Sequence, residues 1–157
     1  MKKKKKIKIR KIKKIDFKKH ARDFGMKSCI VLDWFEDGVR RLIYNVRGSH
    51  FTQYLGVPKE HPLAGFNYDD IPLSCHGGLT FSSEGDGKLY PKGYWWYGWD
   101  YAHAGDYCCT RLSEFNEKLK GLNDHDWTLE EVIEDGQEVV DSFKKLMKLA
   151  ENIKINL

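Results

Sequence analysis

The clearest periodic pattern of the chain lies between residues 128 and 153. Apolar residues recur there at steps of three and four, the spacing of one helix face: Val132, Val139, Val140, Phe143, Leu146, Met147, Ala150 and Ile153. The preceding Thr128-Leu129-Glu130-Glu131 is a capping-box sequence, in which the threonine and glutamate side chains satisfy free backbone amides. The pattern predicts an amphipathic helix over about 128–153, and Gly136 within it indicates close packing on a sheet.

Runs rich in β-branched and aromatic residues predict strands before this helix. Residues 28–35 and 39–46 flank the turn sequence Glu36-Asp37-Gly38 and should form a hairpin. Further strands are expected at 50–57, 78–82 and 94–101. Strands followed by one long helix favour a single α+β domain. We therefore predict a mostly antiparallel sheet packed by the C-terminal helix, with long ordered loops rich in glycine and proline.

The charge of the chain is unevenly distributed. Residues 1–19 hold twelve Lys and Arg against Asp16 alone, a net +11 within a total of +4, so the remainder carries −7. We interpret residues 1–19 as a solvated, partly disordered basic arm and residues 20–157 as the folded domain. An acidic domain repels phosphate, so nucleic acid is an expected partner only through the arm. No apolar run approaches roughly 18 residues, so no membrane partner is expected.

Histidines and carboxylates gather in the middle of the chain. Four of the six histidines lie between 50 and 103, and one of them opens the segment His76-Gly77-Gly78-Leu79-Thr80. Two successive glycines permit positive φ and let backbone amides point at an anion. A histidine beside such a turn can bind a phosphate or transfer a proton. The alternative is a histidine that merely precedes a glycine turn.

A second candidate group follows the strand at 94–101. In Asp100-x-x-His103-x-x-Asp106, either aspartate can hold the histidine ring in one tautomer. The strand itself carries Trp96 and Trp99, whose rings could stack on a base or belong to the core. Asp69, Asp70 and His61 add polar groups upstream. The histidines and aspartates could supply a divalent metal site, but no short-range chelating motif is present, so no metal ligand and no cofactor are predicted.

The two glycine-rich segments, together with 54–58, 61–63 and 68–70, resemble a family of small proteins from bacteriophages and low-GC Gram-positive bacteria. That family carries HGGLTF-like and WW-x-G-[FW]-D-x-AHAGD-like motifs, which here span Cys75 to Phe81 and Tyr94 to Asp106. The resemblance implies a phage context in which small proteins counter host defence, some by capturing or cleaving nucleotide signals. The family usually has an aliphatic residue at Cys75, which argues against a cysteine nucleophile.

These observations predict a phage-type counter-defence protein in the host cytoplasm, where free cysteines are normal. It would hydrolyse a phosphodiester or ADP-ribose-type nucleotide signal by acid–base chemistry. The expected catalytic residues are His76, His103, Asp100 and Asp106, and the expected ligand-binding residues are Gly77, Gly78, Thr80, Asp69, Asp70, His61, Trp96 and Trp99. Two alternatives stay open: a protein that only sequesters the nucleotide, and a protein-interaction module with a structural His/Asp cluster. The oligomeric state is not predicted.

Overall fold

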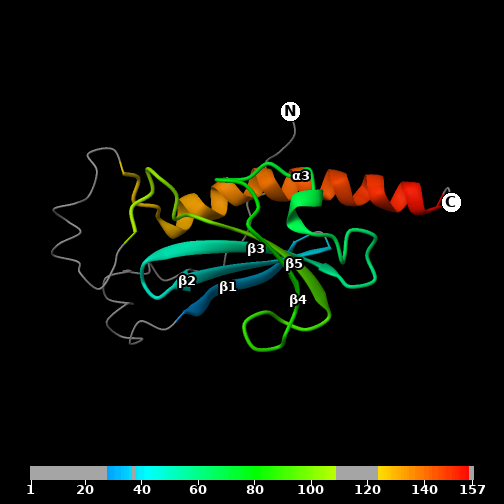
Figure 1. The fold of residues 1–157 in the computed structure, drawn as a ribbon, viewed down its shortest axis with the longest axis horizontal. Helices are drawn as coiled ribbons and strands as arrows, with labels where there is room; N and C mark the ends of the chain where they lie inside the picture. The colour runs from blue at the N-terminus through cyan, green and yellow to red at the C-terminus, as the bar shows by residue number, and fades with distance from the viewer. Residues whose placement is uncertain (1–27, 37, 109–123, 156–157) are drawn as a thin grey trace.

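The computed structural model of the chain describes residues 28–36, 38–108 and 124–155, so the basic arm lies outside the described residues. These residues form one antiparallel sheet and one long helix (Figure 1). The strands are β1 (Cys29–Glu36), β2 (Val39–Val46), β3 (His50–Pro58), β4 (Phe81–Glu84) and β5 (Tyr94–Asp100), in the spatial order β1-β2-β3-β5-β4. A short 3₁₀ helix, η1, covers Tyr68–Asp70, and the long helix, α3, covers Leu129–Ile155. The predicted α+β class is confirmed.

The strand register follows the turn signals of the sequence. Glu36 pairs with Val39 across the predicted hairpin, and β2 continues antiparallel into β3. Strand β5 lies against β3 with Asp100 opposite Thr52 and Tyr94 opposite Pro58. Strand β4 begins at Phe81, later than the predicted residue 78, because the glycines before it have positive φ and form a turn. Because Asp100 pairs with Thr52, the end of β5 lies at the same end of the sheet as the start of β3.

Helix α3 covers one face of the sheet (Figure 1). Its first turn contains the predicted capping box: the Thr128 amide donates to Glu131 Oε2 at 2.8 Å, and the Glu131 amide donates to Thr128 Oγ1 at 3.2 Å. Val132, Val140 and Phe143 are fully buried against the sheet. Within the described ranges, no helix combines the length and apolar character that crossing a membrane requires.

The opposite face of the sheet is covered as well. Leu42, Tyr44, Tyr54 and Trp96 form a second buried cluster there, and Phe81 and Tyr90 pack against it. Phe81 begins β4, and Tyr90 lies in the loop that joins β4 to β5. The tyrosine, tryptophan and phenylalanine rings of this cluster meet edge to face or tilted, the arrangements that aromatic pairs prefer. Both faces of β5 are therefore core.

A buried polar ladder connects the sheet to α3. The fully buried Arg41 guanidinium donates to Gln53 Oε1 at 2.8 Å and pairs with Glu36 at 3.2 Å. Gln53 Nε2 donates in turn to the Tyr101 hydroxyl at 3.1 Å and to the Val132 carbonyl at 3.0 Å. Burial lowers the pKa of Arg41 and the Glu36 carboxylate opposes this effect. A buried charge of this kind is tolerated because nearly all its donors are paired.

We expect Gly136→Ala to destabilise the protein, although alanine is the better helix former. A Cβ at this position would lie 2.2 Å from Gln53 Oε1, so it would displace a side chain that the ladder holds. Overpacking of this kind costs about 1–3 kcal/mol, more than the gain in helix propensity of about 1 kcal/mol. Urea denaturation measures the effect. Ser142→Ala, at an exposed site of α3, is the control and should not destabilise; equal behaviour of both variants would contradict the expected close packing.

We expect Glu131→Gln to remove a pH-dependent contribution to stability. The hydrogen bond from the Thr128 amide holds the pKa of Glu131 below its usual value, against a smaller opposing effect of burial. A carboxylate with a lowered pKa stabilises the folded state above its unfolded pKa and loses this contribution as the pH falls through its folded pKa. Glutamine keeps the neutral hydrogen bond. The variant should be less stable at pH 7 by about 0.3–1 kcal/mol, and the difference should shrink towards pH 3. A constant difference in urea midpoints would refute this.

Candidate functional site

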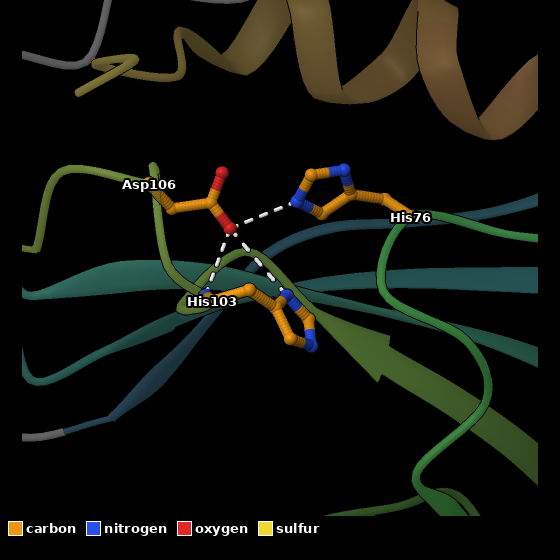
Figure 2. A group of neighbouring side chains, drawn as sticks. All are labelled: His76, His103 and Asp106. Atoms are coloured by element: carbon orange, nitrogen blue, oxygen red, sulfur yellow. Dashed lines mark hydrogen bonds and ion pairs between the residues drawn. The ribbon is translucent and has the colours of Figure 1, made fainter. Parts of the chain in front are cut away.

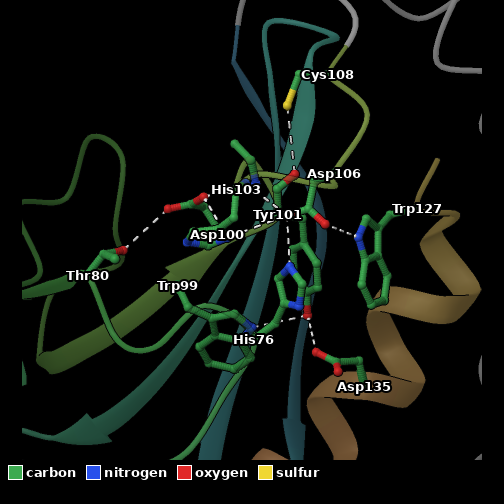
Figure 3. Close-up of polar contacts among 11 residues, drawn as sticks. His76, Thr80, Trp99, Asp100, Tyr101, His103, Asp106, Cys108, Trp127 and Asp135 are labelled. Atoms are coloured by element: carbon green, nitrogen blue, oxygen red, sulfur yellow. Dashed lines mark hydrogen bonds and ion pairs between the residues drawn. The ribbon is translucent and has the colours of Figure 1, made fainter. Parts of the chain in front are cut away.

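Three chain segments meet beyond the end of β5. The loop 101–107 follows the strand, the turn 75–78 precedes β4, and the segment 125–128 leads into α3 (Figure 3). A parallel bridge between Asp106 and His125 holds the first and third segments together, with Tyr107 N donating to His125 O at 2.8 Å and His125 N donating to Gly105 O at 2.7 Å. Residues far apart in the sequence therefore surround one point.

That point is the carboxylate of Asp106, whose side chain is only 4 % exposed. His76 Nε2 lies 2.8 Å from Oδ2, the His103 amide donates to the same oxygen at 2.9 Å, and Trp127 Nε1 donates to Oδ1 at 2.8 Å (Figures 2 and 3). Burial by itself would raise the pKa of Asp106, but the hydrogen bonds from His76, Trp127 and the His103 amide outweigh burial and lower it. The Asp106 carboxylate is thus ionised and buried, and it accepts hydrogen bonds through both oxygens.

His76 is held by this carboxylate and by two aromatic rings. An ionised carboxylate only accepts, so His76 must donate from Nε2 and carries a proton there. Its ring stacks on Tyr101, with ring centroids 5.0 Å apart and planes 8° apart, and meets the Trp127 ring at 65°. The Tyr101 hydroxyl donates to Asp135 Oδ2 at 2.7 Å, which fixes the stacking ring from α3. The orientation of His76 is therefore set by both the loop and the helix.

His103 approaches the same carboxylate from the other side. Its Nδ1 lies 3.4 Å from Asp106 Oδ2 and 3.8 Å from Asp100 Oδ1, and this buried nitrogen makes no hydrogen bond. The two imidazole centroids are 5.3 Å apart. Side chains of His76 and His103 are 26 % and 32 % exposed. The structure thus brings two partly accessible imidazoles to one buried carboxylate.

The predicted glycine turn and Asp100 border this group. Gly77 and Gly78 have φ values of +66° and +86°. A Cβ on Gly77 would lie 2.1 Å from His103 Cε1, so only glycine leaves room for the ring. Asp100 Oδ1 accepts from the Ala102 amide at 3.0 Å, and Thr80 Oγ1 lies 3.5 Å from Asp100 Oδ2. The four expected catalytic residues are therefore neighbours.

Other expected site residues lie elsewhere. His61 follows β3 at the opposite end of the sheet, where its Nε2 is 3.3 Å from Glu151 of α3. Asp69 and Asp70 lie exposed in η1, and in the described ranges no hydrogen bond or ion pair joins their side chains to His76 or His103. Trp96 and Trp99 are almost fully buried, in the cores of opposite sheet faces. Their rings offer no exposed face for stacking a ligand, because the β4–β5 segment and α3 cover them.

Several residues that shape the site were not predicted from the sequence. Trp127 donates a hydrogen bond to Asp106, Tyr101 stacks on His76, and Asp135 holds Tyr101 through its hydroxyl (Figure 3). The sequence signal for Trp127 was weak, since it lies one residue before the capping threonine and far from Asp106 along the chain. Burial raises the pKa of the Cys75 thiol to about 12. A protonated thiol is a poor nucleophile, in agreement with the argument against a cysteine mechanism.

Comparison of the chain with protein-family models, curated proteins and solved structures finds no match. Ligand atoms of His76, His103 and Asp106 all lie within 4.8 Å of one another, and no other group of three such residues occurs in the part of the chain that the structure describes.

We expect Gly77→Ala to move His103, and Gly78→Ala to leave it in place. Both substitutions put a side chain at positive φ, at a cost of roughly 1–2 kcal/mol. Only the Cβ at residue 77 collides with the His103 ring, because nothing lies within 4 Å of a Cβ at residue 78. Imidazole proton shifts of His103, followed by NMR, should change in the first variant far more than in the second. Equal shifts in both would contradict the role given to Gly77.

Proposed function

We propose that this protein hydrolyses a phosphoester bond of a small nucleotide at the group formed by His76, His103 and Asp106. The observation that carries the proposal is the convergence of two partly exposed imidazoles on one buried, ionised carboxylate beside a glycine turn. Imidazole is the common acid–base group near neutral pH. A carboxylate that fixes its tautomer and supports its positive charge is its usual partner in catalysis.

The reaction needs one group to accept a proton from water and one to donate a proton to the leaving oxygen. His103 faces the two aspartates through Nδ1, which leaves Nε2 as the accepting atom. Water attacks phosphorus, its proton passes to His103, and the P–O bond to the leaving group breaks. His76 as an imidazolium donates from Nδ1 to the leaving oxygen while Nε2–H stays on Asp106. The Gly78 amide donates to the Cys75 carbonyl at 3.0 Å, so of the two turn amides that of Gly77 is the one suited to a phosphate oxygen.

The resemblance to phage proteins extends this proposal to a biological role. A phage-encoded hydrolase of this kind would remove a cyclic or ADP-ribose-derived signal that host defence depends on. The buried state of Trp96 and Trp99 supports recognition through phosphate and ribose more than through stacking of the base. The protein would act in the host cytoplasm.

The test is incubation of the purified protein with a panel of cyclic mononucleotides, cyclic dinucleotides and cyclic ADP-ribose derivatives. Denaturation and chromatography then separate cleaved from intact ligand. We expect cleavage of at least one class, and His76→Ala or His103→Ala should lower its rate by about 10²–10⁴-fold, the usual contribution of a positioned acid or base. His61→Ala is the matched control, because this histidine also pairs with a carboxylate but lies outside the group.

Other outcomes separate the alternatives. Depletion of a nucleotide from solution, followed by its intact release on heating, would replace hydrolysis by sequestration. A panel that is neither bound nor cleaved would refute both nucleotide functions and favour a protein-interaction role, with the His/Asp group acting only in the fold.

A further inference from the structure

The ligand atoms around Asp106 have a geometry that a hydrogen-bonded clamp alone does not require. His76 Nε2 and His103 Nδ1 both approach the same oxygen, Asp106 Oδ2, at 2.8 and 3.4 Å (Figure 2). One histidine would suffice to tie the loop to the 75–78 turn. The second leaves its Nδ1 buried without a hydrogen bond, and an unpaired buried polar atom is costly. A cation bound between His76 Nε2, His103 Nδ1 and Asp106 Oδ2 would give the unpaired nitrogen a partner.

We infer that His76 Nε2, His103 Nδ1 and Asp106 Oδ2 bind a divalent first-row transition metal ion of the Zn²⁺ type. Zn–N and Zn–O bonds of about 2.0–2.2 Å put tetrahedral ligand atoms about 3.3 Å apart. The distances of 2.8 and 3.4 Å to Asp106 Oδ2 approach that arrangement, and each of the three residues offers a ligand atom within 4.8 Å of the other two. Small side-chain rotations complete it.

The donor set selects the class of metal. Two imidazole nitrogens and one carboxylate oxygen suit Zn²⁺, Co²⁺, Mn²⁺ or Fe²⁺, whereas Ca²⁺ and Mg²⁺ prefer oxygen ligands alone. Three protein ligands leave positions for water or substrate, as in catalytic rather than structural zinc sites. Asp100 Oδ1 lies 3.8 Å from His103 Nδ1 and is a further carboxylate beside the three ligands.

The surroundings of the three ligands have the features of an outer shell. Trp127 Nε1 donates to Asp106 Oδ1, the oxygen that does not face the histidines, and so orients the carboxylate. Stacking on Tyr101 fixes the plane of the His76 ring. Gly77 leaves room for the His103 ring. Outer-shell groups of this kind hold metal ligands in place and increase affinity.

This inference goes beyond the proposed hydrolysis and does not rest on it. For the ion to bind, the proton on His76 Nε2 moves through solvent to Nδ1, and the freed Nε2 and Asp106 Oδ2 exchange their hydrogen bond for bonds to the metal. His103 coordinates through an unprotonated Nδ1, with its proton on Nε2. Proton sharing and metal binding are thus two alternative states of the same atoms.

The test is titration of untagged, chelator-treated protein with Co²⁺, followed by visible absorption and calorimetry. We expect one Co²⁺ per chain, displaced by Zn²⁺. His103→Asn and Asp106→Asn should abolish this binding, and Trp127→Phe should weaken it by about 10–100-fold, the effect of losing an outer-shell partner. His61→Gln is the control: its Nε2 also faces a carboxylate, at 3.3 Å, without a third ligand in the described ranges. Circular dichroism verifies that each variant is folded.

A second measurement uses the unaltered protein, in case the variants do not fold. Substoichiometric Mn²⁺ should broaden the imidazole resonances of His76 and His103 before those of His61 and His125. Absence of Co²⁺ and Zn²⁺ binding, or binding that persists in both folded ligand variants, would refute the metal site. Metal binding without nucleotide cleavage would keep this site and end the proposed hydrolysis, whereas cleavage by a protein that binds no metal would do the reverse.

Discussion

The site depends on the hydrogen bonds that pair the buried carboxylate of Asp106. Taking a carboxylate out of water costs several kcal/mol unless its oxygens are well paired, and this side chain is almost fully covered. Its partners come from three separate segments: His76 from the turn before β4, the His103 amide from its own loop, and Trp127 from the entry to α3. Removing any one partner leaves the charge under-compensated, so the three segments should order together. The hydrogen bonds that stabilise the loops therefore also position the imidazoles of His76 and His103.

The core of the protein reaches this site through one tyrosine. Tyr101 lies beneath His76, and its hydroxyl joins Asp135 on α3 to Gln53 on β3. Gln53 in turn binds the buried Arg41. A shift of α3 along the sheet would therefore disturb this ladder and tilt the ring on which His76 rests. Gly136 belongs to the same constraint, because its missing side chain leaves the space that Gln53 occupies. The close approach of helix and sheet is thus a condition for the geometry of the histidines.

Elements that depend on local sequence patterns could be predicted from the sequence. The positions of residues that depend on strand register and on long-range contacts could not. Apolar spacing and the Thr128–Glu131 capping box located α3, and the Asp-Gly turn located the first hairpin. The approach of His76 to Asp106 was anticipated because both lie in glycine-rich segments near strand ends. His61 is also near them in sequence, yet the pairing of Pro58 with Tyr94 puts it at the other end of the sheet. The burial of Trp96 depends on a loop that folds back over β5, and the role of Trp127 depends on a bridge across 19 positions. Neither the burial of Trp96 nor the position of Trp127 beside Asp106 follows from a local sequence pattern.

The charge around the site limits what it can bind. Outside the basic arm the chain carries a net −7, and Asp100 and Asp106 both face His103. An anionic phosphate approaching these groups is repelled unless a positive charge lies between it and the carboxylates. The side chains of His76 and His103 are more exposed than that of Asp106, so a ligand meets the imidazoles first. A proton on an imidazole or a divalent ion between the rings would each supply the missing charge. The proposed nucleotide binding would therefore depend on a positive charge at the three ligand atoms, whether a proton or a divalent ion supplies it.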